Sequence, residues 1–167
     1  AEAIRALIKE LNLDLKVAVV LGDDLLEDKD KFLDSGVQEM YSDEKFPEVD
    51  KIASINAYLG AFPIAQALND GADIVITGRS VDSAVTLAAC IHTYGWKEDD
   101  YDKLASGSLA GHIIECGTQS TGGNFTDWEL SSKNLHMIGY PIVDVSENGE
   151  FICTKSNNTS GLVSFGT

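Results

Sequence analysis

The chain has 167 residues, 44% of them hydrophobic, and a formal net charge of -15 at pH 7. That length predicts a single domain with one core, and no apolar run approaches the ~20 residues that a membrane span needs. The acidic surface repels phosphate backbones and anionic lipids, so we expect neither nucleic acid nor a membrane as a partner.

The three cysteines are odd in number and widely spaced, at Cys90, Cys116 and Cys153. They form no C-x-x-C pair, so neither a disulfide framework nor a structural zinc site is expected. The first ten residues, AEAIRALIKE, lack the features of a secretory signal and read as part of a helix without an initiator Met. We therefore expect a reducing, cytoplasmic setting and a piece of a longer protein.

The first elements in the chain are a helix, a strand and a second helix. Apolar and β-branched spacing places them, in order, over residues 2–11, 15–21 and 25–33. Asp23 and Asp24 follow the strand, where carboxylates can either cap the next helix or hold a metal ion. The cap is the favoured interpretation, and the metal site stays open.

The next four elements alternate strand, helix, strand and helix. They are expected over residues 51–58, 63–69, 73–77 and 80–94, after an irregular acidic stretch. Pro63 fits a first helical turn, where its missing N–H costs nothing. Alternation at this spacing predicts right-handed βαβ units.

The C-terminal part predicts one more helix and a hairpin. The helix covers residues 104–116, with Gly107 and Gly111 as interruptions. Two alternating runs flank Asn148 and Gly149, a dipeptide typical of β-hairpin turns. The predicted fold class is therefore α/β, with βαβ units forming a mostly parallel sheet with flanking helices, plus a C-terminal β-hairpin.

The first group of candidate site residues lies at the expected ends of two strands. It consists of Asn56, Thr77, Gly78, Arg79, Asp82 and Ser83. Ligands of open parallel sheets bind beyond the carboxyl ends of the strands, where Gly78 permits close approach and Arg79 adds a cation directly before a helix. A substrate carboxylate or phosphate fits this position, and the alternative is a structural ion pair between Arg79 and Asp82. Ser83 lacks the G-x-S-x-G setting of a hydrolase nucleophile.

The second group combines an imidazole, a carboxylate, a thiol and an amide among glycines. It consists of His112, Glu115, Cys116 and Gln119, followed by Gly122 and Gly123. If the helix continues, His112, Glu115 and Gln119 share one face. His112 and Glu115 could then act as acid and base, or share a metal ion with the two aspartates after the first strand, while Gln119 orients a carbonyl. A local His–Glu hydrogen bond and a core role for Cys116 are the alternatives.

Five stretches of the sequence carry a family resemblance. They are INAYLGAFPIAQAL (55–68), NDGADIVITGRSVDSAVTLA (69–88), LASGSLAGHIIECGTQSTGGNF (104–125), IGYPI (138–142) and TSGLVS (159–164). With these blocks the chain resembles the acyclic terpene utilisation AtuA family. All of the candidate site residues except Asn56 fall within the two central blocks.

The resemblance implies a place in isoprenoid catabolism, in pathways that degrade branched compounds as CoA thioesters. Because the candidate residues fall at predicted strand and helix ends, our leading hypothesis is an enzyme domain that acts on a branched acyl compound, CoA-linked or carboxylated, by lyase or hydratase chemistry. Arg79 would hold the anionic group, and His112 and Glu115 would move the proton. The cofactor is left open. The partners to expect are an acyl-CoA type ligand, acyl-CoA carboxylase subunits and further copies of the chain. The alternative is a non-catalytic subunit or self-assembling component of a catabolic complex, which the scarcity of cations for CoA phosphates favours.

Overall fold

The computed structural model describes residues 1–167 and divides them into two compact units. Unit 1 is Ala1–Val81 and unit 2 is Asp82–Thr167. Each unit combines helices with a pair of strands, which confirms the predicted α/β class. None of the helices is both long and apolar enough to pass through a bilayer.

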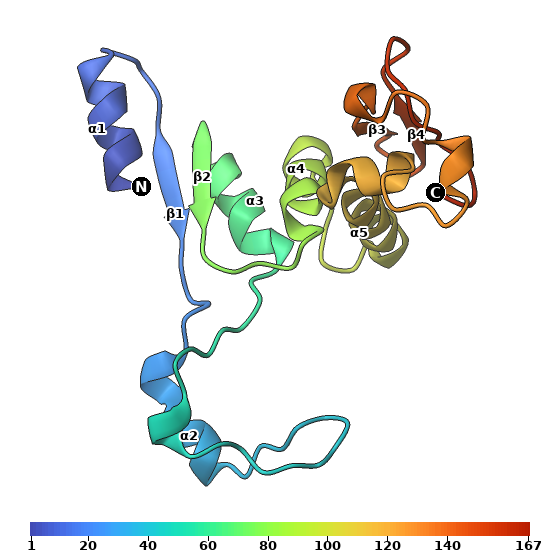
Figure 1. Ribbon diagram of the computed structural model, residues 1–167. Coiled ribbons are helices and arrows are strands. Elements are labelled where there is room, and N and C mark those ends of the chain that lie inside the picture. Colours follow the sequence, from blue (N-terminus) through green and yellow to red (C-terminus); the bar gives the residue numbers. More distant parts are fainter. The chain divides into compact units, whose positions relative to one another are not determined.

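The helices and strands follow one another along the chain as Figure 1 labels them. They are α1 (Glu2–Glu10), β1 (Val17–Val20), α2 (Lys29–Asp34), α3 (Ala61–Asn69), β2 (Ile74–Thr77), α4 (Ala84–Tyr94), α5 (Tyr101–Glu115), β3 (Pro141–Val145) and β4 (Phe151–Lys155). Short 3-10 helices cover Leu26–Asp28, Val49–Lys51, Gly117–Thr121, Trp128–Leu130 and Leu135–Met137.

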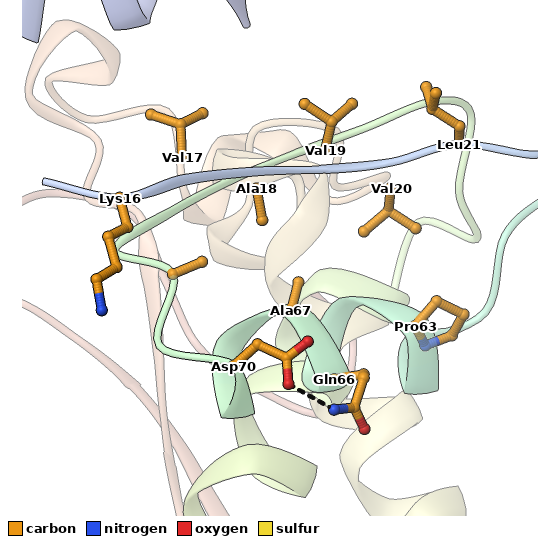
Figure 2. A pocket seen from close by; sticks show the side chains of 11 residues that line it. Lys16, Val17, Ala18, Val19, Val20, Leu21, Pro63, Gln66, Ala67 and Asp70 are labelled. Carbon is orange, nitrogen blue, oxygen red and sulfur yellow. Dashed lines mark hydrogen bonds between the residues drawn. The ribbon is translucent and has the colours of Figure 1, made fainter.

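Unit 1 is built on a parallel pair of strands with a helix on one face. β1 and β2 pair in register from Val17 with Ile74 to Val20 with Thr77, as the βαβ pattern predicts. Ala18 and Val20 point toward α3, whereas Val17, Val19 and Leu21 point to the opposite side (Figure 2). The sheet therefore has one covered face and one open face.

The strand expected over residues 51–58 is wrong. This segment forms only single bridges, between Asp24 and Asn56 and between Leu59 and Ser80. Its backbone bonds go to the loop after β1: Leu25 N–H donates to Ile55 O (2.9 Å), and Ala57 N–H donates to Asp23 O (2.8 Å). Because these partners belong to a loop and not to a strand, the segment is held in place without forming a ladder.

Two predicted helices begin later than expected. The helix predicted from residue 80 starts at Ala84, because residues 79–81 pair with Leu59: Leu59 N–H donates to Arg79 O and Val81 N–H donates to Leu59 O, both at 3.0 Å. The helix predicted over 25–33 is split into a 3-10 turn and α2. Asp24 Oδ1 accepts a hydrogen bond from Leu26 N–H (3.0 Å), but the N-cap positions are Leu25 for the 3-10 turn and Asp28 for α2, and neither has a side-chain cap hydrogen bond.

Unit 2 is organised by the contact between α4 and α5. Gly107 and Gly111 do not interrupt α5; both are buried against α4. A Cβ at Gly111 would lie 2.7 Å from Ser83 O, and one at Gly107 would lie 2.8 Å from Leu87 Cδ1. The expected interruptions are therefore the positions where the two helices approach most closely.

The C-terminal hairpin forms as predicted and is fastened to the helices. β3 and β4 pair antiparallel, and Gly149 closes the turn with a φ of +92°. Trp96 Nε1 donates to Glu147 O (2.8 Å), and the Ser106 hydroxyl donates to Gly149 O. Side chains from the loop after α4 and from α5 thus satisfy carbonyls of the turn, which fixes the hairpin within unit 2.

Candidate functional site

In unit 1, the loops that follow β1 and β2 are joined by the carboxylate of Asp23. Its Oδ2 accepts hydrogen bonds from the backbone N–H of Arg79 (2.7 Å) and from Asn56 Nδ2 (3.1 Å). The bond from Arg79 N–H is the main reason why the pKa of Asp23 lies below its usual value, with Asn56 adding to it. The predicted anion position at Arg79 therefore exists, and the chain's own Asp23 fills it.

The absence of a side chain at Gly78 is what allows this arrangement. A Cβ built on Gly78 would overlap the Asp23 carboxyl group. The glycine permits a close approach, as the sequence predicts, but the group that approaches comes from Asp23. Thr77, just before it, is the last residue of β2 and pairs with Val20.

Arg79 is not directly before a helix, because α4 begins only at Ala84. Its guanidinium carbon lies 5.3 Å from the centroid of the Tyr58 ring, a cation–π geometry. Both side chains are exposed. Within unit 1, Tyr58 is thus the partner of the Arg79 side chain, and sequence reasoning missed it because an isolated Tyr in a loop gives no signal.

In unit 2, the structure brings the second group of candidates to one pocket. A hollow of about 210 Å³ is lined by His112, Ile113, Glu115, Cys116, Gln119, Ser120 and Thr167. The predicted common helix face is wrong in detail, since α5 ends at Glu115 and the chain turns at Gly117 with a φ of +57° into a 3-10 helix. That turn returns Gln119 to the end of α5, so the four polar groups still meet.

Within this pocket, Cys116 and Glu115 form a hydrogen-bonded pair. Cys116 Sγ donates to Glu115 Oε1 (2.8 Å). The hydrogen bond to Glu115 is the main cause that raises the pKa of the exposed Cys116 thiol, with smaller contributions from desolvation and from the charges of Glu115 and Asp82. A thiol with a raised pKa stays protonated at neutral pH, so Cys116 is poorly suited to act as a thiolate nucleophile.

His112 and Gln119 retain free hydrogen-bonding capacity. Their side chains line the pocket and make no hydrogen bond to the rest of the protein. The neighbouring Ser120 hydroxyl is already used, because it donates to Ile113 O (2.6 Å). An imidazole and an amide are therefore the groups available to a ligand's carbonyl or hydroxyl.

Asp82 and Ser83 belong to unit 2, and neither lines the pocket. Ser83 is buried where α5 passes at Gly111, and Asp82 lies close enough to the pocket for its charge to act on Cys116. The DSA and GH-x-x-ECG motifs therefore meet within unit 2. The remaining candidates, Asn56 and Thr77 to Arg79, belong to unit 1. That Arg79 and His112 serve one ligand stays a prediction of the sequence.

The glycines after the pocket residues pack against protein. A Cβ at Gly122 would lie 2.6 Å from Ser131 Cβ, and one at Gly123 would lie 2.9 Å from Thr118 O. Neither glycine lines the pocket. Their predicted role in substrate binding stays a prediction without support from this packing.

No group of three or more His, Cys, Asp or Glu side chains in the structure has the arrangement of a metal site. The metal site considered from sequence would take Asp23 and Asp24 from unit 1 and His112 and Glu115 from unit 2. Each unit alone supplies only two of these ligands, fewer than the three or four protein ligands of a zinc site.

Comparison with known proteins identifies the family. The family model described as "Acyclic terpene utilisation family protein AtuA" matches residues 1–167. The chain belongs to the acyclic terpene utilisation AtuA family. The resemblance seen from about residue 51 onward thus extends over all residues of this AtuA family chain. No curated protein and no solved structure was found to match it.

The AtuA family chain also has a larger hollow, in unit 1, that the sequence did not suggest. About 530 Å³ lies along β1 and α3, lined mainly by apolar groups (Figure 2). At its polar end Gln66 Nε2 donates to Asp70 Oδ1 (2.8 Å). Its charged lining residues, Lys16 and Asp70, form no ion pair with each other, and apolar packing surface dominates the hollow.

Proposed function

We propose that this AtuA family chain is an enzyme domain that acts on a branched acyl compound, CoA-linked or carboxylated, by acid/base chemistry of the lyase or hydratase kind. The observation that carries the proposal is the pocket of unit 2, where four polar groups meet. These are His112, Glu115, Cys116 and Gln119. The family description supports the substrate class, since acyclic terpenes are branched chains.

The proposed roles rest on the hydrogen bonds that the pocket side chains make and on those that they leave unused. Glu115 is a proton acceptor, since it already accepts from the Cys116 thiol. Cys116, kept protonated, can return a proton, and His112 can carry one to or from the reacting carbon or water. Gln119 would donate to the acyl carbonyl and hold it in place.

Charge-removing substitutions test the proposal. His112→Gln and Glu115→Gln should each lower kcat for a branched acyl-CoA thioester by roughly 10²–10⁴-fold, the usual contribution of a general acid or base. His136→Gln is the matched control, because His136 is in the same unit and does not line the pocket. Turnover that is unchanged in both pocket variants would refute an acid/base role.

A second candidate function is a non-catalytic, self-assembling component of a catabolic complex, in which copies of this chain or acyl-CoA carboxylase subunits would be the partners. The sheet of unit 1 favours it. This parallel sheet has only two strands, and the side chain of Val19 on its open face is 38% exposed. Parallel sheets are normally covered on both faces and have more than two strands. We therefore expect further strands, from a partner, to pair with β1 or β2.

Native mass measurements and a pull-down against acyl-CoA carboxylase separate the two functions. For an assembly component, Val19→Lys should reduce the native mass, because an edge lysine opposes strand addition. Val85→Lys, at an exposed position of α4, should leave the mass unchanged. A native mass that Val19→Lys does not change would refute assembly through this strand.

A further inference from the structure

We propose that Asp82 and Glu115 make the pocket of unit 2 selective for an uncharged acyl group, such as a thioester carbonyl, over the corresponding free carboxylate. The inference rests on the proposed function and narrows it, because it separates the CoA-linked substrate from the carboxylated one.

The first step is the charge around the pocket. Unit 2 contains four lysines and no arginine, and none of the lysines lines the pocket: Lys97, Lys103, Lys133 and Lys155. Lys103 lies 3.8 Å from Asp100, and Lys155 Nζ donates to Thr159 O (2.8 Å), so two of them have other partners. Unit 2 therefore supplies no fixed cation at the pocket to neutralise an anionic ligand group.

The second step places a second carboxylate beside Glu115. Asp82 precedes Ser83, and a Cβ on Gly111 would lie 2.9 Å from Ser83 Cα. Since Gly111 immediately precedes His112, this contact brings Asp82 to the end of α5 that forms the pocket. The raised pKa of the Cys116 thiol shows the same two negative charges acting at one place.

The third step is what the pocket offers to a ligand. The free side-chain donors are those of His112 and Gln119, which suit a carbonyl oxygen. A volume of about 210 Å³ is below the roughly 300–1,000 Å³ of pockets that hold a drug-sized ligand. The pocket therefore suits a short acyl group, whereas the bulk of a CoA carrier would lie outside.

The test compares two ligands that share one branched acyl group, of which one is anionic and the other is neutral. 3-Methylbut-2-enoic acid and its N-acetylcysteamine thioester are titrated into the full chain, and their dissociation constants are measured by NMR. We expect the neutral thioester to bind about tenfold more tightly than the carboxylate, and the preference to shrink at high salt, because two nearby anions repel the acid.

Variants assign the preference to its cause. Asp82→Asn should tighten binding of the acid by about threefold and leave the thioester within twofold of wild type. Asp144→Asn, on the outer face of the hairpin, should change neither constant. A thioester that binds no better than the acid, a failure of both to bind, or an Asp82→Asn variant with wild-type preference would each overturn the inference.

Turnover and ligand binding together distinguish a failure of the selectivity from a failure of the proposed function. Loss of turnover in His112→Gln without any preference for the neutral ligand would overturn the selectivity alone. A clear preference with unchanged turnover in His112→Gln would uphold the selectivity and overturn the acid/base role.

Discussion

At the scale of single residues, Gly78 and Asp23 account for the loop cluster of unit 1. The sequence shows a glycine followed by an arginine after a strand, a pattern that indicates an anion site. The structure supplies the anion from Asp23, which lies 33 positions before Asn56 and 56 positions before Arg79. The residues next to Gly78 and next to Asp23 give no signal of this contact. The anion site could therefore be predicted from the sequence, but the carboxylate that fills it could not.

Gly78→Ala should lower the melting temperature by about 3 °C or more, because the new methyl group would displace the Asp23 carboxylate from Arg79 N–H. Gly60→Ala is the control, since a Cβ there meets nothing within 4 Å and the φ of -84° suits alanine. Thermal unfolding followed by circular dichroism measures both. Equal melting temperatures for the two variants would show that Asp23 does not occupy this position.

The lowered pKa of Asp23 gives a pH dependence with a definite sign. A carboxyl group whose folded pKa is below its unfolded pKa stabilises the folded state at neutral pH, and this contribution is lost as the pH falls through the folded pKa. Between about pH 5 and pH 2, wild-type protein should therefore lose stability more steeply than Asp23→Asn. Urea unfolding across this range measures the difference, and identical slopes would be the contrary result.

At the scale of elements, two glycines decide how α4 and α5 pack. In sequence, Gly107 and Gly111 read as weak points of a helix; in the structure they are its contact surface. Helix propensity is a local property, whereas close packing depends on the partner helix, which the local sequence does not reveal.

Gly111→Ala should lower the free energy of unfolding by about 1–2 kcal/mol. Alanine in a helix gains about 1 kcal/mol over glycine, but overpacking costs about 1–3 kcal/mol or more. Overpacking should win, because the atoms it would meet are the backbone of Ser83 and cannot rotate away. Ala105→Gly, at an exposed position of the same helix, reports propensity alone. A Gly111→Ala variant more stable than wild type would contradict the packing described.

The elements also show where prediction from sequence succeeds. β2 and the hairpin are formed by alternating or β-branched runs with a turn dipeptide, so local signals suffice. The segment 51–58 has a similar composition, yet its backbone pairs with a loop at Asp23 and Leu25. Which backbone the segment pairs with depends on tertiary contacts, and the residue pattern of the segment does not reveal it.

At the scale of the whole molecule, the sequence predicts one domain and the structure has two compact units. The single-domain prediction stays a prediction, which the number of calorimetric unfolding transitions would test. The candidate pocket belongs to unit 2. Its polar residues could be predicted because four side chains able to bind or move protons or to donate hydrogen bonds lie between residues 112 and 119. Its geometry was not, since it depends on the turn at Gly117.

The most direct test of the central claim, that this pocket binds the acyl group, is an NMR titration of the histidine side chains. The chain has only three histidines, so the imidazole signals of His92, His112 and His136 can be followed separately. Adding the neutral branched thioester should shift the His112 signals saturably and leave the other two in place. Unmoved His112 signals, or equal shifts of all three histidines, would contradict the account.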